Sequence, residues 1–238
     1  MAGIKIAIVN ASTVLKDKEV ETAVPALQKQ VSGDFTPHWG IDAELLFVPK
    51  GHKAPVDFWQ LTVLDNSEHA GVLGYHDMTK AGQPLGKIFA GSVLHYGKAW
   101  TITASHELLE MLGDPNINLV AFSEGESLLY AYEVCDACES DQYAYKIDGI
   151  LVSDFVYPGW FEPLHVARKE KFDFMGKISR PFGLLPGGFI GVYNIGSGGG
   201  WTQLTAPKSK LVYSDRAPVG SRRERRRTPK RQWLRSKI

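Results

Sequence analysis

The chain of 238 residues is 44% hydrophobic and 22% charged, an ordinary composition for a soluble globular protein of one domain or two small ones. Its net charge is +1, but the segment Ser221 to Ile238 carries +8 and the preceding 220 residues carry −7. No apolar run approaches the roughly 18 residues of a spanning helix, and the apolar N-terminal stretch is too short for a secretory signal. We therefore expect a cytoplasmic protein or a virion component, with no membrane insertion.

The first half of the sequence alternates strand and helix signals. A helix is predicted over Lys18–Val31, where a leucine and three valines fall on one face at helical spacing. A second helix is predicted over about Thr101–Leu112, with Gly113 as the residue that stops it and Pro115 just beyond. Strands are predicted at Lys5–Asn10, Ala43–Pro49, Gln60–Leu64 and Gly71–His76, and an extended run at Lys87–Tyr96.

The second half is less regular and rich in strand signals. Glycine-rich turns at 186–188 and 198–200 bracket a predicted hairpin through Ile190 and Tyr193. Further strands are predicted at Asn118–Ser123, Ser127–Tyr132, Ile150–Tyr157 and Phe172–Ile178. The sequence thus predicts an α+β fold, with a mixed twisted sheet before an irregular, β-rich C-terminal half. We expect one domain over residues 1–215 and a basic tail over residues 216–238.

The second predicted helix carries the pattern His-Glu-x-x-Glu. His106 and Glu110 are four residues apart, so both side chains point the same way and could share one metal ion. Glu107 lies beside them, where a general base would activate a metal-bound water. Alternatively, His106 is a hydrogen-bonded core histidine and the glutamates are solvated helix residues, which need no metal to explain them.

Catalytic zinc takes three protein ligands and leaves one position for water, so a third ligand is needed. In thermolysin-like zinc peptidases a downstream glutamate completes the shell and a nearby aspartate orients a ligand histidine. Here Glu133 would be that ligand, with Asp136 as the acceptor that fixes the His106 ring. Asp114 is the alternative ligand, provided that Gly113 turns the chain back. Zn²⁺ suits this set, and its many oxygens also suit Mn²⁺ or Ca²⁺.

Three segments carry a resemblance to a known group of proteins. They are Ser-His-Glu-Leu-Leu-Glu-Met-Leu-Gly-Asp-Pro from Ser105, Tyr-Glu-Val-Cys-Asp-Ala-Cys-Glu from Tyr132, and Val-Ser-Asp-Phe-Val-Tyr-Pro-Gly-Trp-Phe from Val152. Together with the N-terminal segment up to Gly40, they resemble zincin-like proteins of bacteria and tailed phages, over roughly residues 1 to 205. The resemblance implies a zincin-like fold, in which a first helix on a mixed sheet is followed by a metal-bearing helix, and a metallopeptidase activity.

Such a peptidase would hydrolyse a protein or peptide substrate with a metal-activated water, and Glu107 would act first as base and then as acid. A donor for the transition state is also needed, and Tyr157 and His76 are the candidates. Cys135 and Cys138 form a lone Cys-x-x-Cys without further paired ligands, which favours two reduced, partly buried thiols over a zinc knuckle.

The basic tail suggests a second function. It contains Arg222, Arg223, Arg225, Arg226 and Arg227, a run that can bind acidic protein surfaces or nucleic acid through charge. The rival to the peptidase is therefore a structural or assembly protein, such as a virion component, built on a non-catalytic zincin-like fold. In that case the tail would contact neighbouring subunits or nucleic acid.

Overall fold

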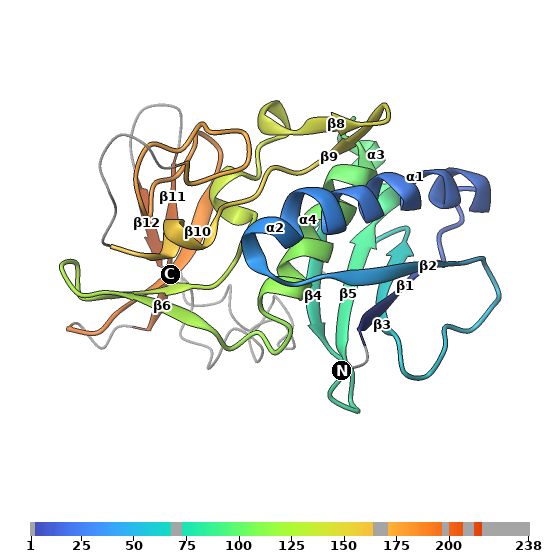
Figure 1. Cartoon of the computed structure of the whole chain (residues 1–238), viewed down its shortest axis with the longest axis horizontal. Helices are drawn as coiled ribbons and strands as arrows, with labels where there is room; N and C mark the ends of the chain where they lie inside the picture. Colours follow the sequence, from blue (N-terminus) through green and yellow to red (C-terminus); the bar gives the residue numbers. More distant parts are fainter. Residues whose placement is uncertain (1–2, 68–72, 164–170, 197–199, 207–211, 216–238) are drawn as a thin grey trace, which may run out of the picture. The chain divides into compact units, whose positions relative to one another are not determined.

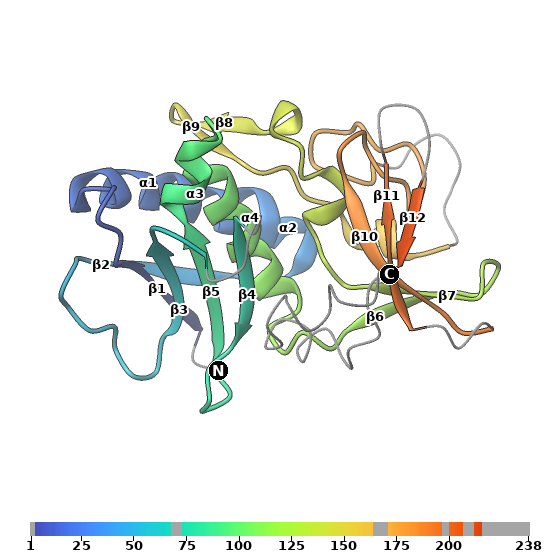
Figure 2. The same ribbon diagram turned by 180° about the vertical axis from the view of Figure 1, so that it is seen from behind.

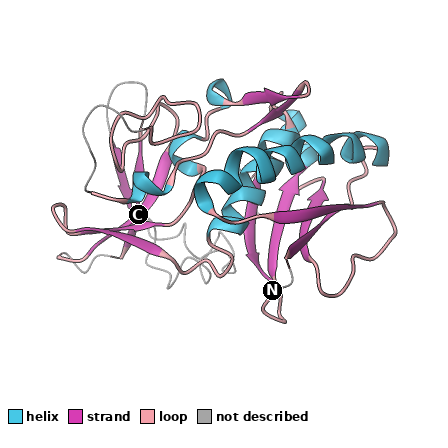
Figure 3. Ribbon diagram, in the orientation of Figure 1, coloured by secondary structure: helices cyan, strands magenta, loops and turns pink. Residues whose placement is uncertain are grey.

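A computed structural model describes residues 3–67, 73–163, 171–196, 200–206 and 212–215 (Figure 1). The chain forms two compact units. The first contains Met1–Asn116 and Ala144–Ser153, and the second contains Ile117–Tyr143 and Asp154–Ile238. Helices and strands are mixed in the first unit, whereas the second consists of strands, short 3₁₀ turns and loops (Figure 3). The predicted α+β class is confirmed. The boundary predicted at residue 215 stays a prediction.

The first unit is built on a five-stranded mixed sheet in the order β2-β1-β3-β5-β4. The central strands β1 (Ile4–Asn10) and β3 (Trp59–Leu64) pair in parallel, and β2 (Ala43–Val48) and β5 (Pro84–Phe89) extend the parallel part on either side. Only β4 (Gly74–Met78) runs antiparallel, and it forms the edge beside β5. Residues of β4 also contact α4 (Trp100–Gly113), the second helix after β5 in the chain.

Helices cover one face of this sheet, as Figures 1 and 2 show from opposite sides. The first, α1 (Asp17–Lys29), packs on β2 and β1 and continues into a π-helix at Gln30–Phe35 and the short α2 (Thr36–Trp39). The second, α4 (Trp100–Gly113), packs on β5, β4 and β3 after the short α3 (Ala90–His95). The fully buried side chains on this face include Ile6, Ile8, Leu61, Val63, Ile88, Leu108 and Leu109.

A small hairpin, β8 (Tyr145–Ile147) and β9 (Ile150–Val152), belongs to the first unit and packs on α4. Two hydrogen bonds tie it to the helix. Thr101 donates its hydroxyl to the carbonyl of Leu151 at 2.7 Å, and the N–H of Ser153 donates to the Ser105 hydroxyl at 2.6 Å. These bonds hold the N-terminal turns of α4 against the hairpin.

The second unit contains an antiparallel sheet in the order β12-β11-β10-β7-β6. Tyr130 on β7, Trp160 and Phe182 form the centre of its core, with Tyr130 and Phe182 at a ring-centroid distance of 4.3 Å. Short 3₁₀ helices at Asp136–Cys138, Asp141–Tyr143 and Pro158–Phe161 connect the strands. The strands are β6 (Val120–Ser123), β7 (Leu128–Ala131), β10 (Phe189–Asn194), β11 (Trp201–Thr205) and β12 (Val212–Asp215).

Several boundaries differ from the sequence prediction. The extended run over Lys87–Tyr96 is wrong in its second half, because the strand ends at Phe89 and α3 follows. Gly113 does not stop α4 in a left-handed conformation; it is the last helical residue, and Asp114 caps the helix. The strand predicted over Ile150–Tyr157 is regular only to Val152.

Two further strand predictions in the second unit are corrected. Phe172–Ile178 forms a turn with one isolated bridge, Val156 to Asp173, because the Asp173 carboxylate accepts the N–H groups of Lys177 and Ile178. Within the stretch predicted as a hairpin through Ile190 and Tyr193, the described residues form a single strand, β10, which pairs with β11.

The arginines of the tail, from Arg222 to Arg227, lie outside the described residues. Among the helices that the structure describes, none is both long and apolar enough to cross a membrane.

Candidate metal centre

Helix α4 places His106 and Glu110 on the same face, one turn apart. Nε2 of His106 lies 3.2 Å from Oε1 of Glu110. Glu110 is buried, whereas the His106 side chain keeps 12% of its surface exposed. The predicted i, i+4 pairing of these two side chains is therefore present.

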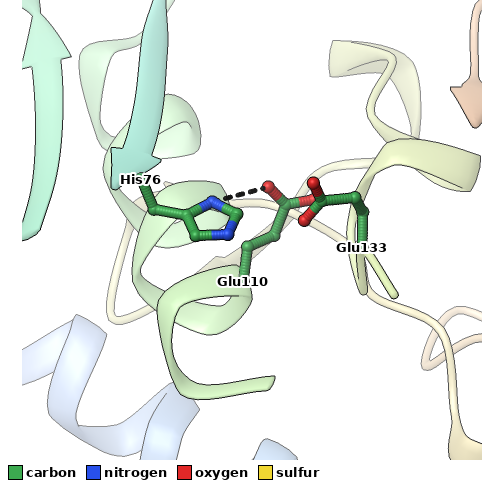
Figure 4. Close-up of side chains that lie close together, drawn as sticks. All are labelled: His76, Glu110 and Glu133. Atoms are coloured by element: carbon green, nitrogen blue, oxygen red, sulfur yellow. Dashed lines mark ion pairs between the residues drawn. The ribbon is translucent and has the colours of Figure 1, made fainter. Parts of the chain in front are cut away.

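A second histidine reaches the same carboxylate from the edge of the sheet. His76 lies on β4 and is fully buried, and its Nδ1 is 3.5 Å from Oε2 of Glu110 (Figure 4). The same nitrogen is 3.6 Å from Oε2 of Glu107. The first unit thus gathers two histidines and two glutamates around one turn of α4.

Glu107 fits against the sheet because two residues there are glycines. A Cβ on Gly74 would lie 2.7 Å from Cγ2 of Thr103 and 2.8 Å from both Cγ and Oε1 of Glu107. Gly86, directly opposite His76 on β5, leaves room for Leu61. Oε2 of Glu107 is buried, and no hydrogen bond reaches it within the described part of the chain. A buried carboxylate oxygen without a hydrogen bond is costly unless a cation compensates it.

Electrostatics favour an ionised Glu110. Burial alone would raise its pKa, but the charge and hydrogen bonding of His106, and then of His76, outweigh burial and hold the pKa well below its usual range. A metal needs its carboxylate ligands deprotonated, so Glu110 is already in the ligating form.

Buried histidine and glutamate groups of this kind could hold a metal ion. The ligand atoms of one tetrahedral ion at bond lengths near 2.0–2.2 Å lie about 3.3 Å apart. The pair His106–Glu110 at 3.2 Å has that spacing. Imidazole nitrogen and carboxylate oxygen are both accepted by zinc, so the donor set fits the ion that the sequence predicts.

His76 is the residue whose position the sequence did not reveal. The sequence offered it only as a transition-state donor, yet it lies against both glutamates of the motif. A signal was present in the alternation of β4, where Gly74 and His76 point to the same face. A small residue beside a histidine on an edge strand leaves space for side chains from a covering helix.

Of the remaining predicted residues, only Asp114 belongs to the first unit. Asp114 is buried at the end of α4, where its N–H donates to the carbonyl of Glu110 at 2.8 Å. Among the described residues, Asp114 belongs to no group of three or more His, Cys, Asp or Glu side chains that lie close enough together to hold one metal ion. Glu133, Asp136 and Tyr157 belong to the second unit, where Glu133 and Asp136 are buried. Their roles stay predictions.

The two cysteines also lie in the second unit. Cys135 and Cys138 are fully buried and carry no disulfide, and Sγ of Cys138 donates to the carbonyl of Cys135 at 3.6 Å. They are more deeply buried than expected. Among the described residues, neither cysteine belongs to a group of side chains close enough together to hold a metal ion.

Comparisons of the chain with models of protein families, with curated proteins and with solved structures found no match.

Proposed function

We propose that this chain is a metal-dependent peptidase in which His106 and Glu110 hold a divalent ion, with zinc as the first candidate. The observation that carries the proposal is the 3.2 Å approach of Nε2 of His106 to Oε1 of Glu110, with the buried Glu107 next to His106 on the same helix. This arrangement joins two ligand side chains to a carboxylate that can move a proton.

A bound divalent ion would supply Lewis-acid chemistry, which lowers the pKa of a coordinated water and polarises a carbonyl oxygen. Glu107 then acts as the general base that removes a proton from the attacking water, and as the acid that returns it to the leaving nitrogen. The position of Glu107 supports this role, because it is buried and directly follows His106 on the same helix.

A zincin-like fold for the first unit is part of the same proposal. Its support is the order of elements, in which a mixed sheet with α1 on one face is followed by α4, the helix that carries the histidine and glutamates. The resemblance of the sequence motifs points to the same fold. Glu133 is the proposed third ligand, on the sequence argument alone.

The test uses the full chain, stripped with a chelator and reloaded with Zn²⁺, and measures bound zinc and hydrolysis of a denatured, dye-labelled protein. Glu107→Gln is expected to keep its zinc and to lose hydrolysis by about 10²–10⁴-fold, as removal of a general base does. Glu44→Gln, at an exposed glutamate of β2, is the matched control and should retain full activity. Wild-type protein that neither binds zinc nor hydrolyses the substrate would overturn the proposal.

The same experiment separates the peptidase from the structural protein that the tail suggests. Zinc bound through His106 and Glu110 without any hydrolysis would mean that the ion only stabilises the fold. Loss of assembly on deletion of residues 216–238, with zinc content unchanged, would then favour the structural function.

A further inference from the structure

The antiparallel sheet of the second unit carries a row of large side chains on the face that points away from its core. The row crosses β6, β7, β10 and β11, which Figure 2 labels, and consists of Phe122, Leu129, Tyr193 and Trp201. Each of these residues lies directly opposite the next in the strand register, and such residues share one face of a sheet. The neighbouring Val192 points to the other face and is buried in the core. We call these four residues the aromatic row.

The aromatic row is accessible to solvent. Phe122 is 49% exposed, and Val120, two residues earlier on the same edge strand, is 42% exposed. Tyr193 and Trp201 are half-buried, and their ring centroids lie 5.9 Å apart. Large apolar side chains that gather on one exposed face mark an interaction surface more often than side chains that are exposed singly. The ligand of this face must therefore offer flat or apolar groups.

A glycine lets the indole of Trp201 lie against the sheet. A Cβ on Gly191 would lie 3.8 Å from Cε3 and 4.0 Å from Cζ3 of Trp201, and 3.3 Å from the Cβ of Ala131. The small residues on β10 and β7 thus make room beside the ring. Aromatic side chains on an open antiparallel sheet stack unpaired bases in RNA-binding modules, and stacking tolerates any base because every base has a π-face.

Positive charge for the phosphates of such a ligand follows the same sheet in the chain. β12 pairs with β11 and ends at Asp215, and Arg222 comes seven residues later. Seven extended residues span up to about 25 Å, whereas the row crosses about 14 Å of sheet. The charge of +8 on Ser221–Ile238 can therefore reach a strand bound along the row. Glu124 and Glu126 lie in the turn after β6, so phosphates are expected nearer to β12 than to β6.

We propose that the aromatic row is a stacking platform for single-stranded nucleic acid, and that the tail arginines bind the phosphates of the same strand. Unpaired bases match the aromatic rings, and the phosphates match the polycation. In a duplex the faces of the bases are covered by their neighbours, so a duplex can use the tail but not the row. The platform lies in the second unit and does not depend on the proposed peptidase.

The test follows the fluorescence anisotropy of a dye-labelled oligothymidine of about 20 nucleotides as the full chain is added, and repeats it with a labelled duplex. Trp201→Ala and Tyr193→Ala are each expected to weaken oligothymidine binding by about 5–150-fold and to leave duplex binding unchanged. Tyr193→Phe keeps the ring and should retain the affinity. Tyr96→Ala, at an exposed tyrosine of the first unit, is the control and should bind both ligands like wild type.

Quenching of tryptophan fluorescence gives a readout of stacking that needs no loss of binding. It is measured in the Trp233→Phe background, so that the tail contributes no tryptophan. Addition of Trp201→Phe keeps a ring on β11, and we expect it to retain binding and to lose most of the quenching by unlabelled oligothymidine. Quenching that persists would overturn the proposal.

Two further results would also overturn the platform. One is oligothymidine binding that is unchanged in both alanine variants, or that falls equally with duplex binding. The other is a wild-type dimer that Phe122→Ala dissociates in sedimentation while oligothymidine affinity stays unchanged, which would assign the row to a second copy of the chain. Zinc binding and hydrolysis should be the same in all these variants, so failure of the platform and failure of the peptidase are distinguishable.

Discussion

Asp154 and Asp173 form a buried carboxyl pair in the second unit, outside the candidate metal centre. Oδ1 of Asp154 accepts the N–H groups of Phe155 and Met175, at 2.8 and 3.1 Å. Burial, followed by hydrogen bonding to Asp173 and by the Asp173 charge, raises the pKa of Asp154 to about 8. Asp154 therefore keeps its proton in the folded protein at neutral pH.

This raised pKa makes stability depend on pH in a defined direction. In the unfolded chain Asp154 titrates near 3.8, so between about pH 4 and 8 the folded state holds one more proton at this group. The free energy of unfolding must then fall as pH rises through this window. Asp154→Asn removes the titration, and its amide can still accept both N–H groups and donate to Asp173. We expect the variant to match wild type near pH 5 and to be more stable by about 3–4 kcal/mol near pH 8.

Thermal unfolding of both proteins from pH 5 to 8.5 measures this difference. Asp57→Asn, at an exposed aspartate, serves as the control and should follow the wild-type curve at every pH. Parallel curves for Asp154→Asn and wild type would show that the pair does not retain a proton on folding.

Single residues also mark the limit of what the sequence could predict about the site. The i, i+4 spacing of His106 and Glu110 is a property of any helix, so it could be read directly from the sequence. The approach of His76 could not, because it depends on β4 pairing antiparallel with β5 in a register that places His76 opposite Gly86. The pairing of Asp154 with Asp173 likewise depends on how two distant segments pack.

At the level of elements, the sheet strand β4 and helix α4 pack tightly at Gly74, which faces the helix. Gly74→Ala would place a methyl group 2.7–2.8 Å from Thr103 and Glu107, closer than real side chains pack. We expect the variant to lose about 1–3 kcal/mol of stability through overpacking. Urea unfolding of the variant and of wild type measures this loss.

Gly33→Ala is the matched control for this substitution. Gly33 is exposed in the π-helix, and no atom lies within 4 Å of its added Cβ. Its replacement should be neutral or stabilise the protein by less than about 1 kcal/mol. Equal stability of Gly74→Ala and Gly33→Ala would show that α4 can move away from β4 at little cost.

The elements that the sequence mispredicted have physical explanations. Lys87–Tyr96 contains apolar residues that fit either strand alternation or a helical face, and periodicity cannot decide between them over so short a run. The change to helix at Ala90 is fixed by tertiary contacts, since the N–H of Ser92 donates to the Asp65 carbonyl at 3.0 Å. Gly91 allows this approach, because a Cβ there would lie 2.6 Å from the same carbonyl oxygen.

The strand predicted over Phe172–Ile178 was wrong for a different reason. Its alternation of apolar and polar residues is that of a strand, but Asp173 bonds the backbone four and five residues ahead and closes a turn. By contrast, β1, β2 and α1 were predicted within one or two residues of their ends, apart from the π-helical continuation of α1. Their apolar patterns are long enough for the strand or helix period to be recognised.

For the whole molecule, the strongest feature is the separation of charge along the chain. The segment Ser221–Ile238 carries +8 against −7 for the residues before it, so it is expected to act as an independent polycation. If it binds nucleic acid through phosphates, the affinity should not depend on base sequence and should fall steeply with salt. Each phosphate neutralised adds about −0.9 to the slope of log K against log salt on duplex DNA.

Fluorescence anisotropy with a labelled DNA duplex at several salt concentrations tests this expectation. Replacement of Arg222, Arg223, Arg225, Arg226 and Arg227 by glutamine should abolish most of the affinity and reduce the slope by several units, whereas replacement by lysine keeps the charge and should retain both. Zinc content should be unchanged in each variant, because the arginines are far in sequence from His106 and Glu110. Binding that resists salt, or that survives the glutamine variant, would mean that the acidic body rather than the tail makes the contact. Since that body carries −7, such binding would need a specific surface, and charge alone could not explain it.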